Sequence, residues 1–160
     1  MVQRWSHLCE SSGVPTGFRS STLPHSELTE QIIRGFHDVV HELGCGFSEK
    51  VQQRALAIVL EDKGLRVETG LGLTVEFRSK LIGTFYPDLI VDRTILIEVK
   101  ATTSIDDSAV AQILNYLKAA GGGVGLLLNF GRKPECKRFV VGDPANSLPR
   151  LRSDARITPP

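Results

Sequence analysis

Few cysteines and no long apolar runs limit what this chain can be. Cys9, Cys45 and Cys136 are odd in number and widely spaced, and no two of them form a C-x-x-C pair. This pattern argues against a disulfide framework and against a zinc site built from cysteines, and it fits a reducing cytoplasm. No stretch approaches the ~20 apolar residues that span a membrane, and the first residues lack an apolar core of signal-peptide length. We therefore expect a soluble cytoplasmic protein with no membrane partner.

Net charge is nearly absent as well. The 160 residues carry 19 basic and 18 acidic side chains, which leaves a formal net charge of +1. Charge alone therefore indicates neither a nucleic acid nor a membrane surface as partner. The 41% of apolar residues suffice for the core of one ordinary domain. Residues 1–25 and 142–160 hold many turn-forming residues and no apolar periodicity, so we expect loose tails around a domain at 26–141.

Periodicity within this domain predicts three helices and five strands. Ser26 and Ser48 are suitable N-caps for the first two helices, and Asp106 or Asp107 for the third. The second helix contains the apolar run ALAIVL, so we expect it to be well buried. Three strands should form a meander before the third helix, and two more should follow it, which makes a mixed α/β sandwich. The predicted helices are 26–44, 48–63 and 106–120, and the predicted strands are 66–77, 81–91, 95–101, 123–130 and 137–141.

The stretch FYPDLIVDRTILIEVK, residues 85–100, predicts a β-hairpin with charges on one face. If the polar segment 92–94 is the tip, Asp88 falls opposite Glu98 on the neighbouring strand. Side chains alternate along a strand, so Lys100 shares the face of Glu98. The other face is wholly apolar and consists of Leu89, Val91, Ile95, Ile97 and Val99.

Two opposed carboxylates repel each other, because each raises the free energy of ionising its neighbour. Either the Lys100 ammonium or a divalent metal can compensate for this repulsion, and hard oxygen ligands suit Mg²⁺. A Mg²⁺ ion held by Asp88 and Glu98 would polarise a phosphodiester and supply hydroxide, with Lys100 orienting the water or stabilising the developing charge. The alternative is a salt-bridged hairpin face without catalytic function.

The combination of Pro87-Asp88 with Glu98-Val99-Lys100 resembles the signature of the PD-(D/E)xK nuclease superfamily. Several segments are similar, in the same order, to one branch of it, the GxxExxY proteins. The resemblance implies a restriction-endonuclease-like αβββαβ core, in which helices flank a central mixed sheet. It covers residues 27–141 and is carried by HELGCGFSEKV (41–51), PDLIV (87–91), ILIEVK (95–100), QILNYLKA (112–119) and LLLNFG (126–131).

The resemblance also implies a metal site and a reaction. Asp88 and Glu98 would hold Mg²⁺ or Mn²⁺, Glu49 would add a carboxylate to the metal shell, and Lys100 would be the catalytic lysine. The implied activity is metal-dependent hydrolysis of phosphodiester bonds in DNA, with RNA as the alternative substrate. The tyrosine that gives the branch its name is replaced by Gln52.

A second motif of the resemblance lies in the third predicted helix. Gln112 and Tyr116 resemble a Gln-x-x-x-Tyr motif that lies beside the site in exonuclease-like branches. Helical spacing independently puts these two side chains on one face. A packing or solvated pair without function is the alternative.

Three further hypotheses remain open from the sequence. The chain could be a non-catalytic module that keeps the fold for binding nucleic acid or protein. His37 and His41 imitate the H-E-x-x-H zinc motif of peptidases, with Asp38 in place of the glutamate and no obvious third ligand. A basic segment could contact a phosphate backbone. Its basic residues include Lys133, Lys137, Arg138, Arg150 and Arg152.

Overall fold

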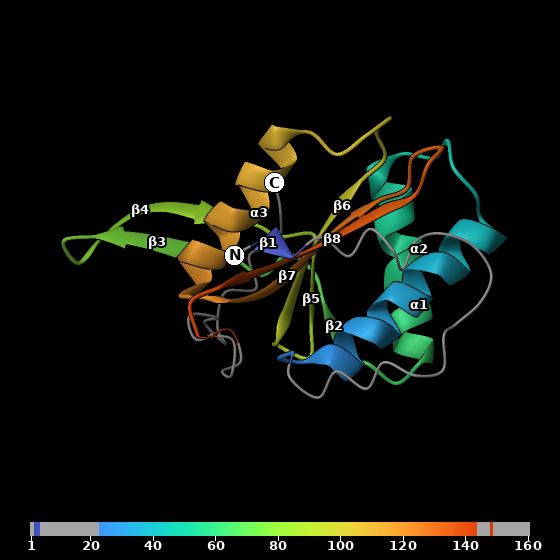
Figure 1. The fold of residues 1–160 in the computed structure, drawn as a ribbon. Helices are drawn as coiled ribbons and strands as arrows, with labels where there is room; N and C mark the ends of the chain where they lie inside the picture. Colours follow the sequence, from blue (N-terminus) through green and yellow to red (C-terminus); the bar gives the residue numbers. More distant parts are fainter. Residues whose placement is uncertain (1, 4–22, 144–147, 149–160) are drawn as a thin grey trace.

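The computed structural model describes residues 2–3, 23–143 and 148. Two helices follow a first short strand along this part of the chain, and a third helix separates five further strands from the last two (Figure 1). The elements are β1 (Val2–Gln3), α1 (Ser26–Glu42), α2 (Glu49–Asp62), β2 (Val67–Glu68), β3 (Leu73–Phe77), β4 (Lys80–Phe85), β5 (Leu89–Val91), β6 (Ile95–Lys100), α3 (Asp107–Ala120), β7 (Gly123–Asn129) and β8 (Glu135–Val141).

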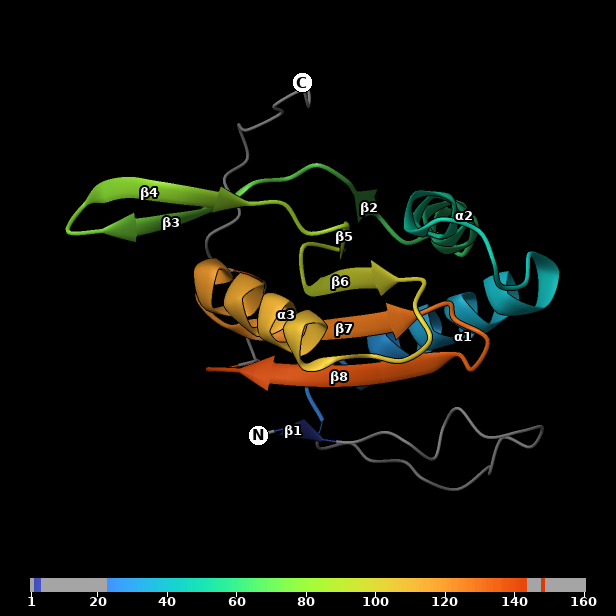
Figure 2. The same ribbon diagram turned by 90° about the horizontal axis from the view of Figure 1, so that it is seen from above.

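A mixed six-stranded sheet forms the centre of the described part, in the order β1-β8-β7-β6-β5-β2. Strands β6 and β7 run parallel, and the other neighbours run antiparallel. Helix α3 connects the parallel pair and covers one face, while α1 and α2 cover the other (Figure 2). The predicted mixed α/β architecture with helices on both sides of a central sheet is confirmed.

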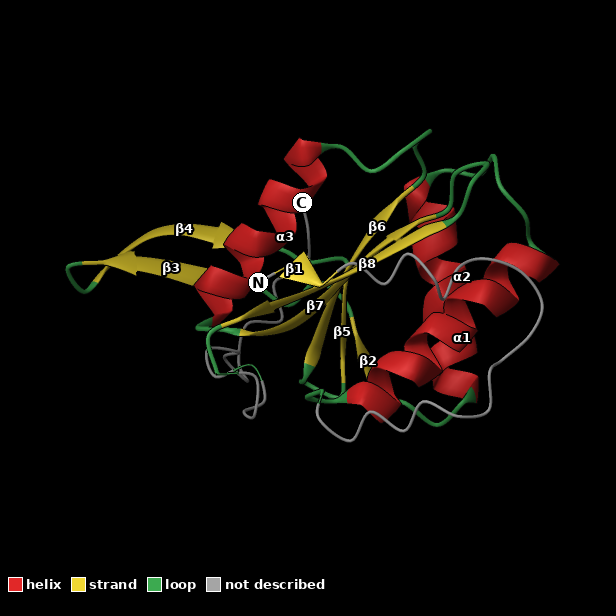
Figure 3. Cartoon of the chain, in the orientation of Figure 1, coloured by secondary structure: helices red, strands yellow, loops and turns green. Residues whose placement is uncertain are grey.

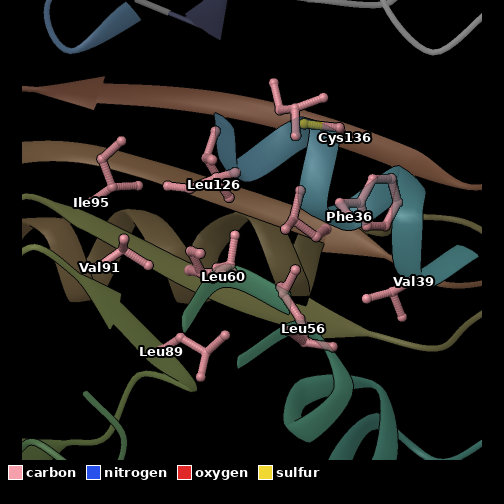
Figure 4. Packing of buried hydrophobic residues seen from close by; sticks show 14 of the residues in the cluster. Phe36, Val39, Leu56, Leu60, Leu89, Val91, Ile95, Leu126 and Cys136 are labelled. Atoms are coloured by element: carbon pink, nitrogen blue, oxygen red, sulfur yellow. The ribbon is translucent and has the colours of Figure 1, made fainter. Parts of the chain in front are cut away.

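The larger apolar cluster lies between the sheet and the pair α1 and α2. Phe36 and Val39 of α1 and Leu56 and Leu60 of α2 meet the strands there (Figure 4). Burying one such side chain stabilises the fold by about 1.5–3 kcal/mol. The apolar face predicted for the hairpin is confirmed, because all its members belong to this cluster. They are Leu89, Val91, Ile95, Ile97 and Val99.

The helix caps follow the sequence in two cases of three. The Ser48 hydroxyl accepts a hydrogen bond from the Val51 N–H at 3.4 Å, and the Asp106 carboxylate accepts one from the Ala109 N–H at 2.8 Å. The prediction for Ser26 was wrong. The N-cap of α1 is His25, which has a left-handed backbone conformation and no side-chain capping bond. Ser26 is instead the first helical residue.

Helix α2 is less buried than the sequence suggested. Its buried residues are Gln52, Leu56 and Leu60, whereas Ile58 is exposed. The helix packs against α1 and the sheet on one side only, so part of the run ALAIVL faces solvent. The prediction of a well-buried helix was wrong for this reason.

The first two strands of the predicted meander are each broken. Gly70, with a φ of 70°, lies between β2 and β3, and Pro87, which lacks an N–H, lies between β4 and β5. Strand β2 pairs with β5, while β3 and β4 pair with each other in a separate two-stranded sheet. This β3–β4 hairpin projects from the body of the molecule (Figures 1 and 2).

Most of both predicted tails, 1–25 and 142–160, lies outside the described residues. Of the described parts, Val2–Gln3 pairs with β8, and Leu148 is buried beside Gly123. No helix in the described part of the chain is long and apolar enough to cross a membrane.

Candidate active site

The β5–β6 hairpin has the register that its sequence predicts. Leu89 pairs with Ile97 and Val91 with Ile95, so the tip is the segment 92–94. Extending this register by one residue places Asp88 opposite Glu98. The Asp88 carboxylate accepts a hydrogen bond at 2.8 Å from the backbone N–H of Val99, which fixes it against β6.

Glu98 is a buried carboxylate with only one of its two oxygens hydrogen-bonded. It is 3% exposed, and its Oε1 accepts a hydrogen bond from Lys100 Nζ at 2.9 Å. Its Oε2 is buried and has no hydrogen-bond partner among the described residues. Burial raises the pKa of Glu98 to about 7, assisted by the negative charge of Asp88 and opposed by Lys100. An unsatisfied buried oxygen of this kind costs about 1–3 kcal/mol.

Asp88 and Lys100 complete a compact group of charges. Burial also raises the pKa of Asp88, against the lowering effects of the Val99 N–H and of Lys100. Burial alone would lower the pKa of Lys100, but its hydrogen bond to Glu98 and the nearby negative charges raise it on balance. Lys100 is hydrogen-bonded to Glu98 and its charge also acts on Asp88, but burial still holds the acidic protons of both carboxylates more strongly than in water.

The donor set fits a hard divalent cation. Mg²⁺ binds through one or two carboxylates and keeps several waters. The unpartnered Glu98 Oε2 beside the carboxylate of Asp88 is the kind of acceptor that such an ion satisfies. In the described part of the chain, no three His, Cys, Asp or Glu side chains are close enough together to hold a metal. A divalent cation at this site would thus have two protein carboxylates as ligands, with water as the remaining ligands.

Glu49 lies near this pair without joining it. It is the first residue of α2, directly after the Ser48 cap. Its negative charge contributes to the raised pKa values of Asp88, Glu98 and Lys100, although other causes are larger. An acidic residue in a first helical turn also interacts favourably with the helix dipole. The role of Glu49 as a metal ligand stays a prediction.

Helix α3 brings Gln112 and Tyr116 to the charged face. Gln112 Nε2 donates a hydrogen bond to the Tyr116 hydroxyl oxygen at 2.8 Å, so the two residues share a helix face as predicted. Burial raises the pKa of Tyr116, and the charges of Glu98 and Asp88 raise it further against the Gln112 hydrogen bond. The Tyr116 hydroxyl is therefore close enough to sense both carboxylates.

Two polar residues that the sequence analysis did not single out position the site. Gln53 Nε2 donates to the Asp88 carbonyl oxygen at 2.6 Å and ties α2 to the start of β5. Asn129 accepts from the Thr102 N–H at 2.9 Å and donates to the Thr102 carbonyl at 3.0 Å. A polar residue inside the apolar run of β7 was the signal for Asn129. No comparable signal marked Gln53.

The ends of the two parallel strands meet at one edge of the sheet. The loops after β6 and β7 lie there together (Figure 3). The Phe130 N–H donates to the Lys100 carbonyl at 2.7 Å, and Gly131 packs so closely on Thr102 that a Cβ would overlap its carbonyl oxygen. These contacts hold the strand end that carries Lys100.

Gln52 occupies the interior instead of the site. It is completely buried, and its Nε2 donates to the Gly44 carbonyl at 2.9 Å. Its Oε1 finds no hydrogen-bond partner in the described part of the chain. Gln52 thus anchors the connection between α1 and α2.

The histidine pair and the basic segment gain little support from the structure. Burial and the neighbouring His41 lower the pKa of His37, and no third zinc ligand lies near this pair among the described residues. Arg138 cannot contact a phosphate backbone, since it is buried and donates to the Pro24 carbonyl at 2.6 Å. That part of the predicted basic surface was wrong. Arg150 and Arg152 lie outside the described residues.

An acidic residue facing a Glu-x-Lys strand, in a mixed sheet flanked by helices, defines a restriction-endonuclease-like domain. A family model described as the PD-(D/E)XK nuclease superfamily matches residues 26–139. The chain belongs to this superfamily. No curated protein and no solved structure was found to match the chain.

Proposed function

We propose that this protein is a metal-dependent nuclease of the GxxExxY branch that hydrolyses phosphodiester bonds in DNA in the cytoplasm. Membership of a nuclease superfamily supports the reaction class. The observation that carries the proposal is the buried, unpartnered Glu98 Oε2 beside Asp88 and Lys100. A carboxylate in this state gains most from a ligand of double positive charge.

Asp88 and Glu98 would hold Mg²⁺ or Mn²⁺, with Glu49 as a further carboxylate at the rim. Such an ion supplies a water of lowered pKa and polarises a phosphoryl oxygen. The protein contributes the two carboxylates at a fixed separation, because β5 and β6 are paired and the Val99 N–H restrains Asp88. Hydrogen bonding from Gln53 to the Asp88 carbonyl restrains the same residue from the side of α2.

Lys100 would act on the reacting phosphate and on the attacking water. Its ammonium has three N–H groups, one of which donates to Glu98. The other N–H groups can orient a water or stabilise negative charge on a phosphoryl oxygen. The positive charge persists at neutral pH because Glu98, Glu49 and Asp88 raise the pKa of Lys100 against the effect of burial.

Gln112 and Tyr116 would position the substrate. The Tyr116 oxygen accepts its hydrogen bond from Gln112, so the hydroxyl proton is directed to another acceptor. A phosphate oxygen next to the carboxylates is an acceptor of the right charge. The pair therefore adds one oriented donor to the site.

The proposal is tested by cleavage of plasmid and single-stranded DNA with Mg²⁺ or Mn²⁺ against a chelator. Asp88→Ala, Glu98→Ala and Lys100→Ala should each lower the rate about a hundredfold or more. Glu61→Ala and Lys118→Ala remove the same kinds of group at exposed positions and should cleave like wild type. If all variants cleaved DNA at the same rate with and without chelator, metal-dependent cleavage at this site would be refuted. Parallel assays on RNA decide between the two substrates.

A second candidate function has its own supporting observation. The Lys100 ammonium already neutralises one oxygen of Glu98, and no three-ligand group is present in the described residues. A non-catalytic module that binds nucleic acid or protein would have this geometry. It predicts binding without Mn²⁺ uptake and without cleavage.

A further inference from the structure

The β3–β4 hairpin exposes three large apolar side chains near its turn. Phe77 is 60% exposed, Leu81 61% and Ile82 64%. The hairpin forms its own two-stranded sheet, and a two-stranded hairpin alone is at best marginally stable in water. Large exposed apolar side chains on a projecting element indicate a binding surface.

The base of the hairpin is continuous with the candidate active site. Leu73 is fully buried in the cluster around α3, and Val75 packs against the same cluster. The Phe85 ring lies 5.4 Å from the Tyr116 ring, centroid to centroid. Only Tyr86 and Pro87 separate Phe85 from Asp88. The base of the hairpin thus lies beside the candidate active site, and its turn lies at the far end.

One face of the hairpin carries aromatic and basic groups in a row. Leu73 pairs with Phe85 and Phe77 pairs with Lys80, and paired residues share a face. Leu73, Val75 and Phe77 lie at alternate positions of β3 and share this face. The register shifts between Val75 and Glu76, and Phe77 pairs with Lys80 beyond this irregularity. We refer to Phe85, Phe77 and Lys80, with Arg78 at the turn, as the stacking face. The Arg78 guanidinium carbon lies 5.3 Å from the Phe77 ring centroid.

The middle of the stacking face is open. Gly83 pairs with Val75 between the two phenylalanines, and a Cβ at Gly83 would meet nothing within 4 Å. The four residue-to-residue steps from Leu73 to Phe77 span ~13 Å. The face therefore offers two aromatic rings on either side of Gly83 and Val75, with positive charge at the outer end.

We propose that the stacking face binds a single-stranded segment of nucleic acid and leads it to Asp88 and Glu98. Aromatic rings stack on the bases of a single strand, which are accessible there and hidden in a duplex, while Arg and Lys contact its phosphates. The inference rests on the proposed function because it names the substrate class of the same site. It assigns single-stranded or flapped nucleic acid as the preferred substrate.

The test is fluorescence anisotropy of the full chain with labelled single-stranded and duplex oligonucleotides of equal length in EDTA, where cleavage is blocked. Phe77→Ala should weaken single-strand binding about tenfold, and Phe77→Trp should retain it. Leu81→Ala is the matched control, because Leu81 is equally exposed but pairs with Glu76 on the opposite face. It should bind like wild type. Arg78→Ala with Lys80→Ala should lower the salt dependence, log K against log salt, by about 1.4.

The outcomes separate this inference from the proposed hydrolysis. Unchanged binding by Phe77→Ala, or an equal loss in Leu81→Ala, overturns the inference even if cleavage is normal. The inference is also overturned if light scattering shows that wild type is a dimer and that Leu81→Ala is a monomer. The hairpin would then join two copies of the chain. If Phe77→Ala weakens binding but wild type cleaves nothing with any metal, the inference about the stacking face is supported and the proposed hydrolytic function is refuted. Thermal melting controls for the folding of every variant.

Discussion

Lys100 Nζ lies 2.9 Å from Glu98 Oε1, two residues earlier on the same strand, while the second oxygen of Glu98 is buried without a partner. The two side chains share a face because residues two apart on a strand point the same way. The spacing Glu-x-Lys therefore creates an ion pair that leaves one carboxylate oxygen for a ligand. This unpartnered oxygen makes both metal binding and stability sensitive to pH.

Metal affinity should depend on pH around neutrality. Without metal, burial and Asp88 raise the pKa of Glu98 to about 7, so a proton competes with the cation below that pH. Mn²⁺ affinity should rise about tenfold per pH unit below 7 and level off above it. Calorimetric titrations at pH 6, 7 and 8 measure this. A pH-independent affinity would show that Glu98 is not a ligand.

Removing the Glu98 charge should stabilise the metal-free protein at alkaline pH. The pKa of Glu98 is raised from 4.5 to about 7 on folding, so the folded state binds more protons than the unfolded state between these values. The contribution of Glu98 to stability is thus lost as the pH rises from about 4.5 through 7. At pH 8, Glu98→Gln should raise the free energy of unfolding by about 1–3 kcal/mol.

Urea unfolding in EDTA at pH 5 and pH 8 provides the measurement, with Glu61→Gln as the exposed control. The gain from Glu98→Gln should be larger at pH 8 than at pH 5. Saturating Mn²⁺ should stabilise wild type and leave Glu98→Gln nearly unchanged. A Glu98→Gln variant that is less stable at pH 8 would mean that the Lys100 ion pair outweighs the effect of burial.

The loop after β7 should be intolerant of a single methyl group. A Cβ at Gly131 would overlap the Thr102 carbonyl oxygen, whereas a Cβ at Gly83 meets open space. We expect Gly131→Ala to lower the free energy of unfolding by about 1–3 kcal/mol through overpacking. Gly83→Ala should change it by less than about 0.5 kcal/mol. Equal unfolding midpoints for the two variants would contradict the close approach of the loop after β7 to Thr102 in the loop after β6.

Tyr116 should contribute to substrate positioning through its hydroxyl alone. Tyr116→Phe keeps the ring contact with Phe85 but removes the donor that Gln112 orients. We expect cleavage to slow about tenfold with unchanged thermal stability, in line with the loss of one hydrogen bond to a charged group. Steady-state kinetics against wild type measure this. Wild-type kinetics in Tyr116→Phe would leave the pair as a packing element.

The sequence predicted the β5–β6 hairpin in detail because its alternation is regular and its tip is short. Asp88 and Glu98 could be placed opposite each other from position numbers alone, and the observed register agrees. The Ser48 and Asp106 caps were predictable for a similar reason, since each satisfies N–H groups within its own turn.

Features that depend on distant parts of the chain could not be predicted in this way. The predicted strands 66–77 and 81–91 each divide into two, and β3 and β4 form a sheet of their own. Which strands pair depends on tertiary contacts, and β-propensity contains no information about those contacts. Gln53 reaches the Asp88 carbonyl only because α2 packs against the sheet. The burial of Arg138 likewise depends on Pro24, which is 114 residues away.

The most direct test of the central claim is electron paramagnetic resonance of Mn²⁺ at pH 8, which counts the ions left free in solution. Wild type and Glu61→Ala should remove Mn²⁺ from the free pool, whereas Asp88→Ala and Glu98→Ala should not. Equal uptake by all four proteins, or no uptake by wild type, would contradict a metal site built on these two carboxylates.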